Sequence, residues 1–73
     1  YGAVPGALGA FLAGDVYAAQ NKYTEAIAAY TKGLTTEPKN VYGLGQRGKA
    51  YVADKKYAPA VADMTQYIAL APG

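Results

Sequence analysis

Residues 21–40, NKYTEAIAAYTKGLTTEPKN, decide the fold of this chain. Alanine, the strongest helix former, recurs through the middle of the stretch. A polar break precedes it at residues 20–23, and Pro38 marks where a helix must stop. Asn40 is a residue type that caps the start of a following helix. The stretch therefore predicts a helix over residues 24–36 and another helix that begins just after Asn40.

The same pattern occurs twice in the chain. Aligning residues 7–39 with residues 41–73 gives ten identical pairs among 33, which is a period of 34 residues. Pro59 supports a break before the last helix, because proline is tolerated in the first turn of a helix and disrupts one that runs through it. The chain is therefore expected to be all-α. The expected helices span residues 8–20 and 24–36 in the first copy, and 42–54 and 58–70 in the second.

This helix-turn-helix unit of 34 residues resembles the tetratricopeptide repeat (TPR) family. The resemblance covers residues 7–73. It implies an all-α fold of two TPR-like helix-turn-helix repeats that form a short right-handed solenoid with no capping helix. The implied organisation is an N-terminal arm at residues 1–6, a first repeat at 7–40 and a second repeat at 41–73. The matching residues are glycine at repeat position 8 (Gly14, Gly48), tyrosine at 11 (Tyr17, Tyr51), alanine at 20 (Ala26, Ala60) and proline at 32 (Pro38, Pro72).

Three positions depart from the family pattern. A large apolar residue is usual where the first repeat has Ala10. Leucine is usual where the two repeats have Ala13 and Arg47, and a small residue is usual where they have Gly33 and Tyr67. The first helix of each repeat therefore looks underfilled for a pair of repeats that stands alone.

The composition excludes most catalytic chemistry. The chain has no cysteine, no histidine and no serine. Their absence removes thiolate and imidazole metal sites, Ser-His and Cys-His nucleophiles and imidazole acid–base catalysis. The five carboxylates, Asp15 and Asp63 among them, show no spacing typical of an acid–base pair and are expected to be surface charges. We therefore assign no catalytic residue, expect no metal and no cofactor, and expect that the chain is not an enzyme.

The charge and the hydropathy also limit the partners. A net charge of +2 is too small to predict binding to nucleic acid. No segment reaches the roughly 20 apolar residues that a membrane span needs. Lys22, Arg47, Lys55 and Lys56 form a weak basic cluster that is expected to be a solvated turn. Protein partners are therefore the expected class.

The family resemblance implies a concave groove that binds an extended peptide and is lined by the first helix of each repeat. Phe11 and Leu12 are unusual there, because this surface is usually polar. They predict either an apolar contact with a partner or packing against the arm at residues 1–6. A clamp for a C-terminal carboxylate is not expected, because Lys49 is the only basic residue of the set. The implied lining residues are Leu8, Phe11, Leu12, Asp15 and Ala18, then Tyr42, Gly45, Gln46, Lys49 and Val52.

The two ends of the chain carry almost no charge. Eleven of the 12 charged residues lie between Asp15 and Lys56. Repeat proteins need polar outer faces on their terminal repeats, and about three repeats are usually needed for stability. The uncharged ends therefore predict head-to-tail stacking into a ring or a helical filament. The expected stacking residues are Ala10, Ala13, Val61, Met64, Tyr67 and Ile68, with Tyr67 beside Ala10 and Ala13 of the next chain.

Two functions stay open at this point. The first is a structural subunit that self-associates head to tail into an oligomer or filament, so that its partner is a second copy of the chain. The second is a peptide-binding TPR adaptor, or a fragment of a longer TPR array, that uses the concave groove. The absence of cysteine and of a starting methionine weakly favours an exported protein, but the sequence does not determine the compartment.

Overall fold

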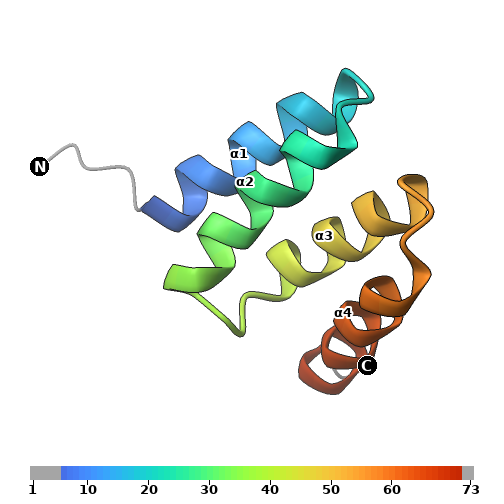
Figure 1. Ribbon diagram of the computed structural model, residues 1–73. Helices are drawn as coiled ribbons and strands as arrows, with labels where there is room; N and C mark the ends of the chain where they lie inside the picture. Colours follow the sequence, from blue (N-terminus) through green and yellow to red (C-terminus); the bar gives the residue numbers. More distant parts are fainter. Residues whose placement is uncertain (1–5, 72–73) are drawn as a thin grey trace, which may run out of the picture.

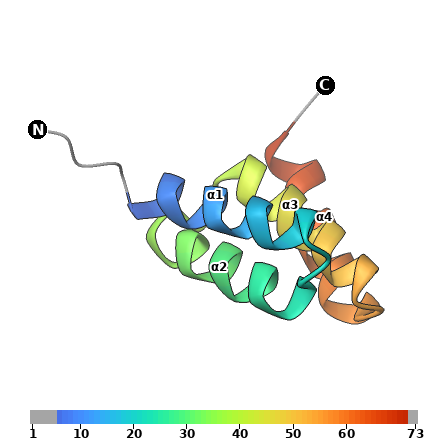
Figure 2. The ribbon, with the colours of Figure 1, turned by 90° about the horizontal axis from the view of Figure 1, so that it is seen from above.

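Four helices make up the protein in a computed structural model that describes residues 6–71. They are α1 (Gly6–Ala19), α2 (Tyr23–Thr36), α3 (Val41–Ala53) and α4 (Tyr57–Leu70). The first repeat consists of α1 and α2, the second repeat consists of α3 and α4, and α3 packs against α2 (Figure 1). The view from above looks along this row of helices, so that α1 overlaps α3 in projection (Figure 2). The expected all-α fold of two helix-turn-helix repeats is confirmed.

The helix bounds lie within two residues of those predicted. Because α1 begins at Gly6, this residue is helical. The rest of the expected arm, residues 1–5, lies outside the described residues, and so does any contact that it makes with Phe11. Asn40 caps α3 as expected, since its side chain accepts a hydrogen bond of 3.0 Å from the amide of Gly43. Within residues 6–71, no helix follows α4.

The turns inside the two repeats share one hydrogen-bonding pattern. Asn21 has a φ of 61° in the first turn, and its counterpart Lys55 has a φ of 62° in the second. In both turns the amide of the next residue donates to the carbonyl five residues before it, at 2.9 Å and 2.8 Å respectively. Glycine and asparagine tolerate this left-handed conformation better than lysine does. The second turn is therefore the more strained of the two.

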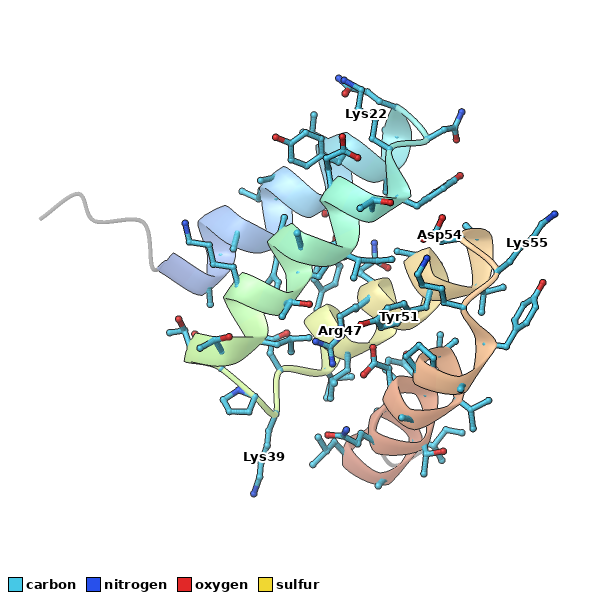
Figure 3. The ribbon with its side chains drawn as sticks, viewed as in Figure 1. Lys22, Lys39, Arg47, Tyr51, Asp54 and Lys55 are labelled. Carbon is cyan, nitrogen blue, oxygen red and sulfur yellow. The ribbon has the colours of Figure 1, made fainter. Side chains whose placement is uncertain are left out.

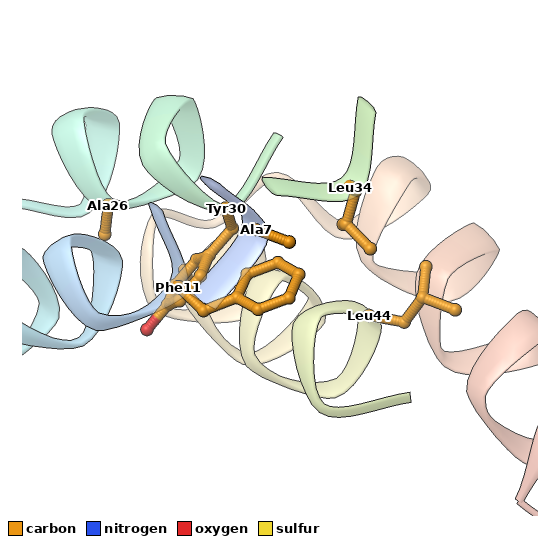
Figure 4. Packing of buried hydrophobic residues seen from close by; sticks show 7 residues of the cluster. Ala7, Phe11, Ala26, Tyr30, Leu34 and Leu44 are labelled. Carbon is orange, nitrogen blue, oxygen red and sulfur yellow. The ribbon is translucent and has the colours of Figure 1, made fainter. Parts of the chain in front are cut away.

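Phe11 lies in the core and not on the surface (Figure 4). Its side chain is 3% exposed and packs in one cluster with Leu34 and Leu44. The ring fits because Gly33 and Gly43 have no side chains, and a Cβ atom added at Gly43 would lie 2.5 Å from the ring. The expectation of an exposed Phe11 that contacts a partner is therefore wrong.

The second repeat places its aromatic ring on the other helix. Tyr67 of α4 packs over Gly45 of α3, where an added Cβ atom would lie 2.9 Å from the ring. In the 34-residue alignment, Gly45 and Tyr67 are the counterparts of Phe11 and Gly33. Tyr67 thus packs within its own chain, although the sequence had placed it against a neighbouring one. The ring fills a space that the sequence had suggested was underfilled.

Arg47 and Asp63 form a buried ion pair between α3 and α4. Asp63 is 2% exposed, and its two carboxylate oxygens accept hydrogen bonds of 2.7 Å from Nε and Nη2 of Arg47. Arg47 also donates from Nη1 to Oγ1 of Thr31 on α2 at 3.2 Å. The expected surface positions of both charges are wrong, because the bidentate geometry satisfies each group inside the protein. The expected basic cluster does not form, since Lys22 and Lys55 lie at separate turns, away from Arg47 (Figure 3). Both lysines are exposed, as expected of solvated turns.

Candidate functional site

A polar cluster joins three helices around the carboxylate of Asp15 on α1. The Tyr30 hydroxyl of α2 donates to Oδ1 at 2.6 Å. From α3, the Tyr42 hydroxyl donates to Oδ2, and Nε2 of Gln46 donates to Oδ1 at 3.1 Å. Asp15 therefore does more than carry a surface charge. It links the first helix of each repeat through the surface that the sequence had assigned to the groove.

The pKa values of the cluster follow from these contacts. Burial raises the pKa of Asp15, but the three hydrogen bonds and the charge of Lys49 together outweigh burial and leave that pKa below its ordinary value. Burial and the hydrogen bond to Asp15 raise the pKa of Tyr30. The hydrogen bond to Asp15, with a smaller contribution from burial, raises the pKa of Tyr42. The ionised carboxylate and the neutral hydroxyls therefore stabilise one another.

Lys49 extends the cluster along α3. Its Nζ lies 3.5 Å from Oε1 of Gln46, so the Gln46 amide stands between the Lys49 ammonium and the Asp15 carboxylate. Lys49 is exposed and makes no ion pair within residues 6–71. In the 34-residue alignment, it is the counterpart of Asp15. The surface that the sequence had assigned to the groove thus presents opposite charges at the same position of consecutive repeats.

The structure brings together four of the ten residues that were predicted to line the groove. Leu8 and Leu12 are 49% and 53% exposed, and they lie one turn apart on α1. Val52 is also exposed but lines a different surface, which is described below. Phe11 is buried and is not available to a partner. The four residues that meet are Asp15, Tyr42, Gln46 and Lys49.

A cavity of about 460 Å³ opens beside this cluster, between α3 and α4. We call it the socket. Gly45 lines it where the first repeat has Phe11, and the Tyr67 ring packs beside this glycine. Its walls are mostly apolar, and Lys49 is its one charged residue. The socket is lined by Val41, Tyr42, Gly45, Gln46, Lys49, Met64 and Tyr67.

A shallow groove of about 420 Å³ runs between α1 and α2 on the side away from α3. We call it the N-end face. It contains the predicted stacking residues Ala10 and Ala13, and its floor consists of small residues. Lys32 is its one charged residue. The face is lined by Gly6, Gly9, Ala10, Ala13, Ala29 and Lys32.

An apolar surface at the opposite end of the molecule surrounds a depression of about 230 Å³. We call it the C-end face. It contains the predicted stacking residues Val61, Met64 and Ile68, of which Val61 is 64% and Ile68 is 71% exposed. It carries no charged residue. The face is lined by Val52, Tyr57, Ala60, Val61, Met64, Thr65 and Ile68.

The C-end face is the counterpart of a surface that the first repeat buries. That surface packs in one core with Leu44 and Ala50 of α3. Sequence reasoning missed Val52 and Tyr57 as members of the C-end face, although the 34-residue alignment pairs both with core positions. In the first repeat this surface consists of the buried Tyr30 and Leu34 and the partly buried Ala18, Tyr23 and Ile27. In the order of the chain, the counterparts of Ala18, Tyr23, Ile27, Tyr30 and Leu34 are Val52, Tyr57, Val61, Met64 and Ile68.

Two other kinds of site are absent from the described part of the chain. None of the helices between residues 6 and 71 is long and apolar enough to cross a membrane. Within the same residues, no group of acidic side chains is placed to hold a metal ion.

Comparisons with known proteins identify relatives of the chain. A family model described as TPR repeat matches residues 14–55. The RNA polymerase II-associated protein 3 of Rattus norvegicus and that of Mus musculus are each 43% identical to the chain over 57 residues. That stretch is 78% of this chain and only 9% of the length of each relative. No solved structure matches the chain.

Proposed function

The chain belongs to the tetratricopeptide repeat family of protein-interaction modules, and we propose that it binds proteins without catalysis and stacks head to tail on copies of itself. In this proposal the C-end face of one copy receives the N-end face of the next. The names of the rat and mouse relatives state an association with RNA polymerase II. We assign no such partner to this chain, because the similarity covers so little of those proteins.

One observation carries the proposal, namely that the exposed C-end face corresponds to a face that α3 covers in the first repeat. A cluster of Tyr57, Val61 and Ile68 in water loses the stabilisation that burial of their counterparts gives the first repeat. A helix of the α3 type is the natural cover for this face. The chain contains a second helix at that position of the repeat, namely α1.

The N-end face has the shape that such a contact needs. Gly43 lets α3 approach Phe11 and Leu34 closely. Its counterpart in α1 is Gly9, an identical residue that lies in the N-end face. Small residues at Ala10 and Ala13 leave room for the bulkier side chains of the C-end face. Since the two faces differ, the contact is heterologous, and repetition of it closes a ring or grows a filament.

A pair of blocked variants tests this proposal. Val61→Glu places a charge in the C-end face, and Ala13→Glu places one in the N-end face. Both sites are exposed in the single chain, so both variants are expected to fold. Each variant alone should remain a monomer of 7.6 kDa. An equimolar mixture should form a 1:1 complex of twice that mass and nothing larger, because one intact face remains on each chain.

Two outcomes would contradict the proposal. Self-association of Ala13→Glu alone would mean that two C-end faces meet each other. A mixture that stays monomeric at high concentration would mean that the two faces do not bind. Ala28→Glu and Ala62→Glu serve as matched controls, since both alanines are exposed on α2 and α4 and line neither face. Both controls should assemble as the unmodified chain does.

A second candidate function is peptide binding on the concave side. It is favoured by the apolar socket with Lys49 at its edge, which suits an acidic residue next to an apolar one. Titration of monomeric Val61→Glu with short peptides of that composition tests it by calorimetry. Binding that is lost in Val61→Glu carrying Lys49→Glu would support this function, and absence of binding would remove it.

A further inference from the structure

The socket lies where a stacked neighbour would place its first helix. In the first repeat, the corresponding site is covered by Tyr42 and Gln46 of α3. The Tyr42 ring meets Phe11 edge-on, with 6.3 Å between ring centroids. The Tyr42 hydroxyl and the Gln46 amide both donate to Asp15. One repeat further along, the counterparts of Phe11 and Asp15 are Gly45 and Lys49. These two residues line the socket.

The counterparts of Tyr42 and Gln46 in α1 are two leucines. Leu8 and Leu12 are about half exposed in the single chain, although they are large and apolar. Resting on the stacking proposed above, we infer that the socket of one copy receives Leu8 and Leu12 of the next copy. We further infer that Asp15 of that next copy lies opposite Lys49 of the first.

The shape and chemistry of the socket fit leucine side chains. Gly45 lines the socket beside the Tyr67 ring that packs over it, and no side chain from position 45 narrows the opening. Val41, Met64 and Tyr67 give it apolar walls. A polar occupant such as tyrosine or glutamine would find no carboxylate at position 49, because the residue there is lysine. Lys49 therefore stands where the first repeat has the acceptor Asp15. Leu8 and Leu12 stand where α3 has the hydrogen-bond donors Tyr42 and Gln46.

The charges of Asp15 and Lys49 agree with this placement of the next copy. Within one chain, the order along the groove is Asp15 and then Lys49. A neighbour stacked one repeat further would continue the series with its own Asp15, so that the signs alternate along the assembly. At that junction Leu12 replaces the intervening Gln46, and the Lys49 ammonium faces the carboxylate without an amide between them. A contact between two C-end faces would instead bring two Lys49 side chains to one junction.

The blocked pair provides the test, because it forms a single junction. The Val61→Glu chain contributes its N-end face together with Leu8. The Ala13→Glu chain contributes its C-end face together with the socket and Lys49. Leu8→Ala in the first chain should weaken the complex about tenfold or more, from the apolar area lost. Lys49→Met in the second chain should weaken it about two- to fivefold at low salt, and this difference should shrink as salt is added. Lys49→Glu should weaken it more than Lys49→Met does.

The controls are the same substitutions on the opposite chains. Leu8→Ala in Ala13→Glu, and Lys49→Met in Val61→Glu, lie outside the junction and should leave the dissociation constant unchanged. If the complex forms and Leu8→Ala in Val61→Glu changes the constant by less than twofold, the socket inference is wrong and the stacking still stands. If no complex forms with the unmodified blocked pair, the stacking itself is wrong and the inference falls with it.

Discussion

Each repeat packs one aromatic ring against one glycine between its two helices, but the two repeats place the ring on different helices. In the first repeat, the ring of Phe11 on the first helix packs over Gly33 on the second. In the second repeat, the ring of Tyr67 on the second helix packs over Gly45 on the first. Each pair has one ring and one glycine, so the volume between the helices is kept while the helix that supplies the ring changes. The pairing of a ring with a glycine, more than either residue alone, sets the distance between the helices.

A second pair of positions differs in chemistry as well as in size. Ala13 and Ala29 lie in the open N-end face of the first repeat. Their counterparts are Arg47 and Asp63, which form the buried ion pair of the second repeat. The charged pair also reaches α2 through Thr31 and therefore ties the repeats together. The small pair makes no such link and lies in an open groove between α1 and α2.

The largest expected effect comes from breaking the ion pair of the second repeat. Asp63→Ala leaves the Arg47 guanidinium partly buried and unpaired, and it should cost about 3–5 kcal/mol of unfolding free energy. Arg47→Ala combined with Asp63→Ala recreates the pair found in the first repeat and should recover more than half of that loss. Urea unfolding followed by circular dichroism measures both. A single variant as stable as the unmodified chain would show that the ion pair does not hold the second repeat.

The ring and glycine pairs are expected to respond unequally to an added methyl group. Gly33→Ala pushes against Phe11, which is fully enclosed, and should cost about 1–3 kcal/mol. Gly45→Ala should cost less, because Tyr67 is 38% exposed and its ring has room to move. Gly6→Ala is the control, since no atom lies within 4 Å of the added Cβ. Thermal unfolding of the three variants gives the order, and equal losses at Gly33 and Gly45 would contradict the account.

Acid and alkali should both weaken the contact between the repeats through the polar cluster. The pKa of Asp15 is lowered in the folded state, so its contribution is present above about pH 4 and is lost as the pH falls further. The pKa values of Tyr30 and Tyr42 are raised, so their contribution is present below about pH 10 and is lost as the pH rises further. Urea midpoints between pH 2 and pH 11 measure both limbs. Asp15→Asn should flatten both the acid and the alkaline limb. A dependence of the urea midpoint on pH that this variant leaves unchanged would show that the polar cluster does not stabilise the fold.

The smallest expected effect concerns the two turns. Lys55→Gly relieves the left-handed conformation of a residue with a side chain and should stabilise the protein by about 0.5–1 kcal/mol. Asn21→Gly should gain less, because asparagine tolerates this conformation and Oδ1 of Asn21 accepts a hydrogen bond of 2.8 Å from the Tyr23 hydroxyl. Thermal unfolding of each variant beside the unmodified chain measures both gains. A larger gain at Asn21 would reverse the expected order.

Much of the fold could be predicted from the sequence, because the period of 34 residues, Pro38 and Asn40 fix where the helices begin and end. The burial of Phe11 could not, since it depends on Gly33 and Gly43, which come close only after three helices have packed. Asp63 was expected at the surface for a similar reason, because its partner Arg47 lies on another helix.

The candidate surfaces were predicted in part. Ala10, Ala13, Val61 and Ile68 were expected at the ends of the molecule from their positions in the repeats and from the absence of charge, and they are found on the two end faces. The role of the socket required the structure, since a glycine in a sequence does not reveal what fills the space above it.

The central claim is that the C-end face of one copy binds the N-end face of another copy. The most direct measurement is the mass of the unmodified chain in solution by light scattering, across a concentration series, with circular dichroism of the same samples. We predict a helical protein whose average mass rises with concentration to beyond twice 7.6 kDa. A helical protein that keeps the mass of one chain at the highest concentration would contradict the claim.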